Sequence, residues 1–334
     1  MKTVFYFLNL SLLALSINAA SAADKPVLTV YTYDAFAADW GPGPKIKAGF
    51  EKTCDCVVDI VASDSSIGIL RKVQLEHKNP KADVVLGLDT NLAEIARTTG
   101  LFVDHGADTT NLDLPIIWSD QQFLPFDYGY FAFIYNNEKL ARAPKSFREL
   151  VATPDDFKII IQDPRSATPG LGLLLWIKQA YPENAAELWK GLAPKILTVT
   201  KGWSEAYNLF LKGEADMVLS YTTSPAYHMI AENVDRYQAA PFDEGHYMQI
   251  ETGAILKTSK NQDLARRFMT FMISDEVQGL IPQTNWMLPV TKLASGLPAA
   301  FSKLHTPKVS LLKSGADVAI NRKQWIAEWQ EALR

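Results

Sequence analysis

The sequence lacks the local patterns that mark the common enzyme and metal-binding classes. It contains no GxSxG, HExxH, P-loop or Rossmann glycine motif, and its 5 histidines show no metal-ligand spacing. Acidic residues are numerous but scattered, so their spacing assigns no general acid–base pair. We therefore expect no catalytic residue, no metal ion and no cofactor.

The sequence also lacks a large excess of charge of one sign. The 334 residues include 33 lysines and arginines against 37 aspartates and glutamates, which gives a net charge of −4 and no basic stripe. This balance argues against nucleic acid as a partner. The sequence has no internal repeat, heptad run or low-complexity linker, and a chain of this length is too long for one ordinary core, which suggests two domains.

One long apolar run is present, and it stands at the start of the sequence. Lys2 precedes the apolar segment 4–15, and Ala20-Ser21-Ala22 forms a small-residue cleavage site. The run is too short and too polar for a membrane anchor, which needs ~20 predominantly apolar residues, and no later segment is long enough to span a bilayer. The pattern predicts a signal peptide over 1–22 and an exported, soluble mature chain.

Cysteine is scarce, with only Cys54 and Cys56 present. A disulfide across one intervening residue is tight but feasible, and an oxidising compartment favours it. A metal site would need further ligands nearby in the sequence, and a reactive nucleophile would need a free thiol. We favour the disulfide over these two alternatives.

Strand-like and helix-like segments alternate along the mature chain, with short links that favour a largely parallel sheet. Strands are expected over 27–33, 57–62, 82–88, 129–135, 158–161, 217–220 and 249–256, and before Trp203. Helices are expected over 46–52, 67–76, 92–99, 146–151, 170–181, 186–192, 205–212, 261–273 and 317–333, and from Pro225. The strands 129–135 and 249–256 bracket the middle of the chain. They predict hinge crossings between two α/β lobes, one of 23–130 plus 252–334 and one of 131–251.

Groups suited to a ligand follow neighbouring strands, at the carboxyl edge where ligands bind in open α/β sheets. Trp203 follows one strand, and Tyr221, Thr222, Thr223 and Ser224 follow the next. Each residue alone has an ordinary structural explanation, because a serine before a proline can simply cap a helix and a tryptophan at a strand end can belong to the core. Their grouping favours a binding site.

The predicted helix start near residue 170 suits an anion. Thr168 can be the N-cap, and Pro169 can take the first helical position, where a missing N–H costs nothing. Free backbone N–H groups and the hydroxyls of Ser166 and Thr168 would then converge on a phosphate or carboxylate. The alternative is a plain capped helix.

Aromatic side chains occur in both predicted lobes and could sandwich a planar cation. They are Tyr33, Trp40, Trp203, Tyr221, Tyr227 and Trp286, the last of which follows Asn285. Each well-placed ring contributes ~1–2 kcal/mol to the binding of a cation when water is excluded. Asp64, after the second strand, could add a counter-charge.

Long blocks of the sequence resemble the periplasmic thiamine-binding proteins of bacterial thiamine and thiamine pyrophosphate ABC transporters. The resemblance covers essentially the whole mature chain. It is carried by KPVLTVYTYDAFAADWGPGP (25–44), KADVVLGLD (81–89), PFDYGYFAFIY (125–135), QDPRSATPGLGLLLW (162–176), VTKGWSEAYNLFLKGE (199–214), VLSYTTSPAYH (218–228) and NWMLPV (285–290). Blocks of this length are highly specific.

The resemblance implies a two-lobed α/β periplasmic binding protein of type II-like fold. Such a protein closes on thiamine or its mono- and diphosphate esters and delivers them to the membrane permease of an ABC transporter, and we expect a monomer. By position, Trp203 and residues 221–224 fall on the family's ligand contacts, Ala167 and Thr168 on its phosphate-side contacts. Its aromatic walls correspond to Tyr33, Trp40 and Trp286. The residues singled out above, with Ser65 and Ser66 next to Asp64, complete the candidate site.

Two departures from the family pattern bear on the site. A Glu-Asp-Gly of the family reads Asp64-Ser65-Ser66 here, so the acid near the ligand's amino group is either shifted to Asp64 or replaced by the Ser65 hydroxyl. Ala167 replaces a serine, which leaves only the backbone N–H at that position.

Two other functions compete with thiamine capture. Thiaminase I resembles this fold, but it works through a nucleophilic cysteine. A binding protein for another solute, such as a polyamine, ferric ion or sulfate, is the second alternative. Ferric iron would want a cluster of Tyr, His and acidic ligands, and a polyamine would want acids at both ends of the cleft. Aromatic rings beside an anion-binding helix start fit neither solute well.

Overall fold

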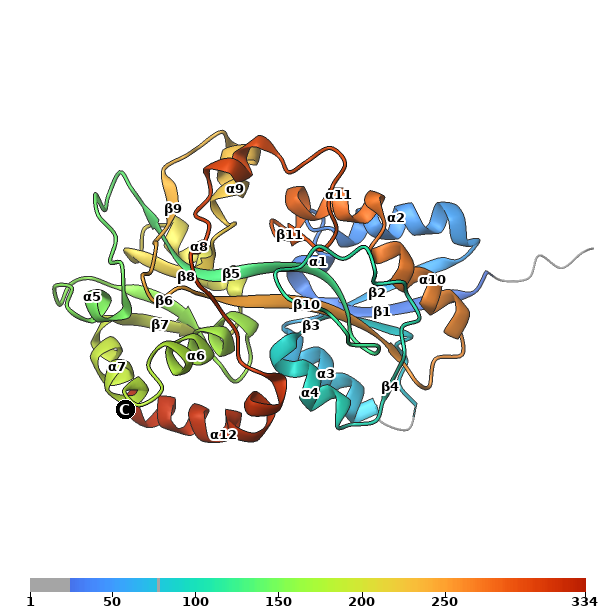
Figure 1. Ribbon diagram of the computed structural model, residues 1–334, viewed down its shortest axis with the longest axis horizontal. Coiled ribbons are helices and arrows are strands. Elements are labelled where there is room, and N and C mark those ends of the chain that lie inside the picture. The colour runs from blue at the N-terminus through green and yellow to red at the C-terminus, as the bar shows by residue number, and fades with distance from the viewer. Residues whose placement is uncertain (1–24, 77–78) are drawn as a thin grey trace, which may run out of the picture.

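The computed structural model describes residues 25–76 and 79–334 as two lobes side by side (Figure 1). The predicted signal peptide over 1–22 lies outside these residues. Two long strands, β5 (Leu124–Asn136) and β10 (His246–Leu256), connect the lobes. Strand β10 pairs with β3 (Val84–Asp89) of the first lobe, and β5 pairs with β8 (Met217–Tyr221) of the second. These strands are the expected hinge crossings, and the proposed lobe boundaries fall inside them.

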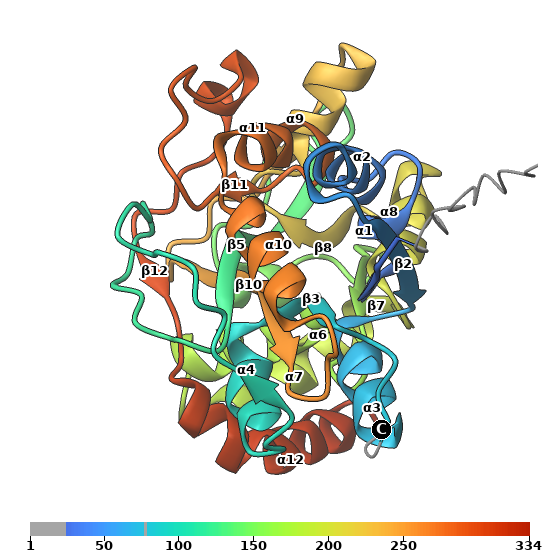
Figure 2. The same cartoon turned by 90° about the vertical axis from the view of Figure 1, so that its right-hand side faces the viewer.

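The first lobe is a sheet covered by helices on both faces (Figure 2). Strand β1 (Val27–Tyr33) lies between β2 (Val57–Ser63) and β3, and both pairings are parallel. One face packs on α2 (Gly43–Cys54), α10 (Gln262–Met272) and α11 (Asp275–Thr284), and the other on α3 (Ser66–Glu76) and α4 (Thr90–Arg97). Since both faces are covered, β3 is buried along its whole length, as its continuous apolar run predicts.

The second lobe repeats this plan around β6 (Ile159–Gln162), which pairs in parallel with β7 (Ile196–Thr200) and β8. Helices α5 (Phe147–Val151), α6 (Thr168–Ala180) and α7 (Ala185–Leu192) share the largest core cluster, and α8 (Trp203–Leu211) covers the opposite face. The expected parallel pairing holds among β1, β2 and β3 and among β6, β7 and β8, but the sheet as a whole is mixed and not largely parallel, because β10 runs antiparallel to β3 and β5 runs antiparallel to β8. The crossing strands are antiparallel to each other, because β5 carries the chain out of the first lobe and β10 carries it back.

The C-terminal helix α12 (Gly315–Ala332) packs against α4 of the first lobe and α7 of the second. Ser314 caps it by accepting a hydrogen bond from the Asp317 N–H at 3.1 Å. Trp329 is 4% exposed and meets the Trp189 ring edge-on at 6.4 Å between centroids. Trp329 therefore docks this helix against α7 of the second lobe.

The remaining elements are short. They are α1 (Asp34–Ala37), β4 (Phe102–Val103), α9 (Pro225–Tyr227) with a π-helical turn over 228–232, β9 (Tyr237–Ala239), β11 (Leu288–Pro289), β12 (Ser310–Leu311) and two 3-10 helices, Ala193–Lys195 and Ala299–Lys303. The predicted disulfide between Cys54 and Cys56 is confirmed at the end of α2. In the part of the chain that the structure describes, no helix is long and apolar enough to cross a membrane.

Candidate functional site

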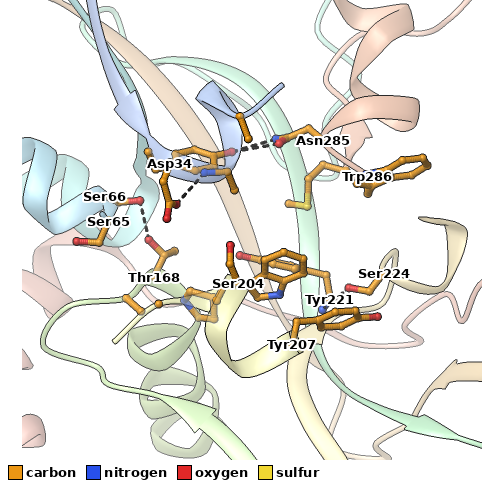
Figure 3. Close-up of a pocket in the computed structure, with 18 of the residues that line it drawn as sticks. Asp34, Ser65, Ser66, Thr168, Ser204, Tyr207, Tyr221, Ser224, Asn285 and Trp286 are labelled. Carbon is orange, nitrogen blue, oxygen red and sulfur yellow. Dashed lines mark hydrogen bonds between the residues drawn. The ribbon is translucent and has the colours of Figure 1, made fainter. Parts of the chain in front are cut away.

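A cavity of about 620 Å³ lies between the lobes, lined by residues of both (Figure 3). Most of the candidate residues line it, namely Tyr33, Trp40, Asp64, Ser65, Ser66, Ala167, Thr168, Trp203, Tyr221, Ser224, Tyr227, Asn285 and Trp286. Ser166, Thr222 and Thr223 are not among the lining residues. The structure therefore brings together segments that are widely separated in the sequence.

The three candidates outside the lining are either hydrogen-bonded elsewhere or buried. The Ser166 hydroxyl donates to the Lys201 carbonyl at 2.9 Å. Thr222 and Thr223 are each 2% exposed, and the Thr223 hydroxyl lies 4.0 Å from the Met287 sulfur. The turn after β8 directs these two threonines into the protein, and leaves Tyr221 and Ser224 at the cavity.

An aromatic stack forms the wall on the second lobe. Trp203 is the first residue of α8, and its ring stacks on Tyr207, with centroids 4.9 Å apart and planes 23° apart. The indole N–H donates to the Ser220 hydroxyl at 2.7 Å, and the Ser224 hydroxyl lies 2.7 Å from the same oxygen. Sequence reasoning missed Tyr207, although its spacing of four residues from Trp203 places both on one face of a helix.

A second aromatic pair at the cavity consists of Trp286 and Tyr227, one from each lobe, which meet edge-on at 5.2 Å between centroids. Trp286 has a φ of 57°, a left-handed conformation that is rare for a bulky residue and often occurs at functional sites. Trp40 is 54% exposed at the cavity. Tyr33 packs over Gly87, where an added Cβ would lie 2.4 Å from the tyrosine ring, so a glycine is required there.

The helix start near residue 170 differs from the prediction. Thr168 is not the N-cap, because α6 already begins at Thr168 and the Ala167 carbonyl accepts the first helical hydrogen bond, from Leu171 at 3.0 Å. The Thr168 hydroxyl instead donates to the Ser66 hydroxyl at 2.9 Å, across the cleft (Figure 3). Ala167 and Thr168 still line the cavity beside the helix start.

Asp64 and its neighbours also join the lobes. Asp64 forms an ion pair with Lys201 of the second lobe, and this hydrogen-bonded lysine holds the pKa of the Asp64 carboxyl below its usual range. The Ser65 hydroxyl accepts from the Gly68 N–H at 3.1 Å and so caps α3. The lobes therefore touch beside the cavity through one loop of the first lobe, in which Asp64 pairs with Lys201 and Ser66 bonds to Thr168.

One buried acid, Glu251, lines the cavity, and a second, Asp127, lies opposite it on the neighbouring strand; sequence reasoning missed both. Glu251 of β10 lines the cavity and accepts hydrogen bonds from the Tyr33 hydroxyl at 2.7 Å and the Gln249 amide at 2.8 Å. Asp127 of β5 accepts from the Asn285 amide at 2.6 Å. Burial raises the pKa of Glu251 to about 7 and that of Asp127 well above its ordinary value. The sequence feature that could have indicated them is an acidic residue inside each of two otherwise apolar strands.

Metal-ion binding by clustered side chains has no support in the described ranges 25–76 and 79–334. No group of three or more His, Cys, Asp or Glu side chains there is placed to hold a metal ion. The two cysteines are bonded to each other and do not line the cavity.

Comparison with known proteins gives a consistent result. Residues 28–279 match the family model described as bacterial extracellular solute-binding protein. The thiamine-binding periplasmic protein of Escherichia coli K12 is 52% identical over 92% of this chain and 94% of its own length, and that of Haemophilus influenzae is 42% identical over 96% of each. A solved periplasmic thiamin binding protein has a TM-score of 0.90 and 52% identity, covering 93% of this chain and 97% of that chain.

More distant structures share the fold alone. An apo ferric ion-binding protein A from Pasteurella haemolytica has a TM-score of 0.75 at 17% identity. The chain belongs to the bacterial extracellular solute-binding proteins and, within them, to the thiamine-binding periplasmic proteins.

Proposed function

We propose that this protein captures thiamine or its phosphate esters in the periplasm and delivers them to the membrane permease of an ABC transporter. One observation carries the proposal. The cavity between the lobes combines aromatic rings from both lobes with a buried carboxylate, which suits a planar cation. The relatives at 42–52% identity are named thiamine-binding periplasmic proteins, which supports the same ligand.

The candidate ligand contacts follow from this chemistry. Trp203 and Tyr221 of the second lobe and Tyr33 and Trp286 of the first would enclose the rings of thiamine. The start of α6 at Thr168 would hold a phosphate, because its first backbone N–H groups have no helical partners and the helix dipole favours an anion. Closure of the lobes around the ligand would then create the surface that the permease recognises.

An enzyme of the thiaminase I type is not favoured by the cavity. Such chemistry needs a nucleophilic cysteine, and both cysteines are joined in a disulfide at the end of α2. Export to the periplasm, where a disulfide persists, would follow from a signal peptide over 1–22.

Calorimetric titration of the purified mature protein, stripped of ligand by unfolding and refolding, tests the proposal. We expect stoichiometric binding of thiamine, its monophosphate and its diphosphate, with the ligand recovered unchanged. Absence of binding to all three would overturn the proposal, and loss of intact thiamine would indicate an enzyme. Light scattering with and without thiamine would test the expected monomer.

A further inference from the structure

Two buried acids lie opposite each other on the crossing strands, and one of them, Glu251, lines the cavity. Glu251 and Asp127 are directly opposite in the antiparallel pairing of β10 with β5, so their side chains leave the sheet on the same face. Glu251 is 7% exposed and lines the cavity, and Asp127 is fully buried. Like charges placed directly opposite each other destabilise a sheet, so this pair needs a compensating interaction.

No protein cation supplies that compensation. Within 25–76 and 79–334, neither acid forms a salt bridge with a lysine, arginine or histidine. One carboxylate oxygen of Asp127, Oδ1, is buried and has no hydrogen-bond partner among these residues. A buried hydrogen-bond acceptor without a partner destabilises the folded protein by ~1–3 kcal/mol, so the presence of this unpartnered oxygen calls for an explanation.

The groups that surround Glu251 are neutral or acidic. Tyr33 of β1 and Gln249 of β10 donate to its two oxygens, and Tyr221 of β8 and Asp89 of β3 lie close enough to interact with its charge. Burial and the nearby acids raise the pKa of Glu251, and burial together with the charge of Glu251 raises that of Asp127. A cation in the cavity would favour the ionised pair and relieve its repulsion.

We propose that Glu251, supported by Asp127, is the counter-charge that selects a cationic ring in this cavity. This carboxylate would make the protein bind thiamine more tightly than uncharged molecules of the same shape. This inference rests on the proposed function, because it identifies the residue that interacts with the positive charge of the thiazolium. Asp64 cannot take this role as readily, since its carboxylate is already paired with Lys201 at the edge of the cleft.

The test compares thiamine with its thiophene analogue deazathiamine, in which an uncharged ring replaces the thiazolium. Both ligands are titrated calorimetrically into the stripped mature wild-type protein and into Glu251→Gln. Glutamine keeps the shape of the side chain but removes its charge, and its amide nitrogen replaces one of the two acceptor oxygens, so the hydrogen bond from Tyr33 or from Gln249 has to reverse its direction. We expect Glu251→Gln to bind thiamine at least about tenfold more weakly than the wild type, and deazathiamine within about threefold of the wild type.

A matched control removes the same charge elsewhere. Glu187 is exposed on α7 and is not among the lining residues, so Glu187→Gln should bind both ligands as the wild type does. If Glu251→Gln fails to fold by circular dichroism, Asp127→Asn takes its place, with a smaller loss of at least about threefold confined to thiamine.

If Glu251→Gln weakened the binding of thiamine and of deazathiamine equally, the inference would be overturned, because the carboxylate would then interact with another part of the molecule. Unchanged thiamine binding would overturn it as well. Failure of the wild type to bind thiamine would instead refute the proposed function. A second readout is the pH dependence. Wild-type affinity for thiamine should fall as pH decreases from 8 to 6, because protonation removes the counter-charge, and Glu251→Gln should lose most of this dependence.

Discussion

Removal of the Trp203 ring is the most direct perturbation of the aromatic wall. One face of the ring is covered by Tyr207 at 4.9 Å, and the residue also borders the cavity. A planar ligand on the open face would extend the existing stack. Trp203→Ala should therefore remove a ligand contact while leaving the cavity's other walls in place.

The size of the effect follows from the contacts that are lost. Stacking between aromatic rings contributes ~0.5–1.5 kcal/mol, and contact of a desolvated cation with a ring contributes ~1–2 kcal/mol. Together they predict binding weaker by ~1.5–3.5 kcal/mol, so the Kd for thiamine should rise about 10- to 300-fold. The fold should lose less, because Ser220 keeps Ser224 as a hydrogen-bond partner when the indole N–H is removed.

Calorimetry with thiamine, together with urea unfolding, would measure both quantities. Trp203→Phe is a graded variant that keeps a flat face but loses the hydrogen bond to Ser220, and we expect its Kd within about fivefold of the wild type. Trp118→Ala is a matched control, because Trp118 is half-buried, makes one indole hydrogen bond at 3.2 Å and is not among the lining residues. Binding by Trp203→Ala within threefold of the wild type, or equal losses in the two alanine variants, would refute the reasoning.

Three further predictions concern the cleft and a buried histidine. Thr168→Val removes a hydroxyl beside the start of α6, so calorimetry should show a larger loss for thiamine phosphates than for thiamine; equal losses would place the phosphate elsewhere. Lys201→Met frees Asp64 from its ion pair, so an NMR titration should show a higher pKa for the Asp64 carboxyl, and an unchanged pKa would contradict the pairing. Burial lowers the pKa of His246 from 6.5 to about 4, so the unfolded chain takes up a proton that the folded chain resists as pH falls. Relative to His246→Gln, the wild-type free energy of unfolding should therefore drop by up to ~3 kcal/mol as pH falls from 6.5 to 4, as urea unfolding at several pH values can check; parallel curves would refute this.

Much of the fold could be predicted from local sequence. The strand Val27–Tyr33 has the predicted bounds, because its β-branched and aromatic residues are followed by an abrupt change of pattern. Helix α11 was missed, since Pro282 inside it argues against a helix on local grounds, yet the helix is held by packing against the first lobe. The antiparallel direction of β5 and β10 follows from the route of the chain between lobes, which short windows do not reveal.

The site was only partly predictable for a related reason. Trp203 and Tyr221 could be singled out because they follow strands, and ligands bind at that edge of a sheet. The N-cap prediction for Thr168 was wrong because its hydroxyl bonds Ser66 of the other lobe, a partner that local sequence cannot supply. Glu251 and Asp127 become neighbours only through the register of two strands that are far apart in the sequence.

The two proposals together imply one orientation of the ligand. Carboxylates on the crossing strands favour the cationic ring beside β10, and the start of α6 favours the phosphate in the second lobe. A phosphorylated thiamine carries both charges, so it would connect the hinge strand β10 to the second lobe. Free thiamine lacks the anion and would depend more strongly on Glu251. The affinity for the phosphorylated ligand divided by that for thiamine should therefore rise in Glu251→Gln and fall in Thr168→Val. A simple loss of cavity shape would not produce these opposite changes.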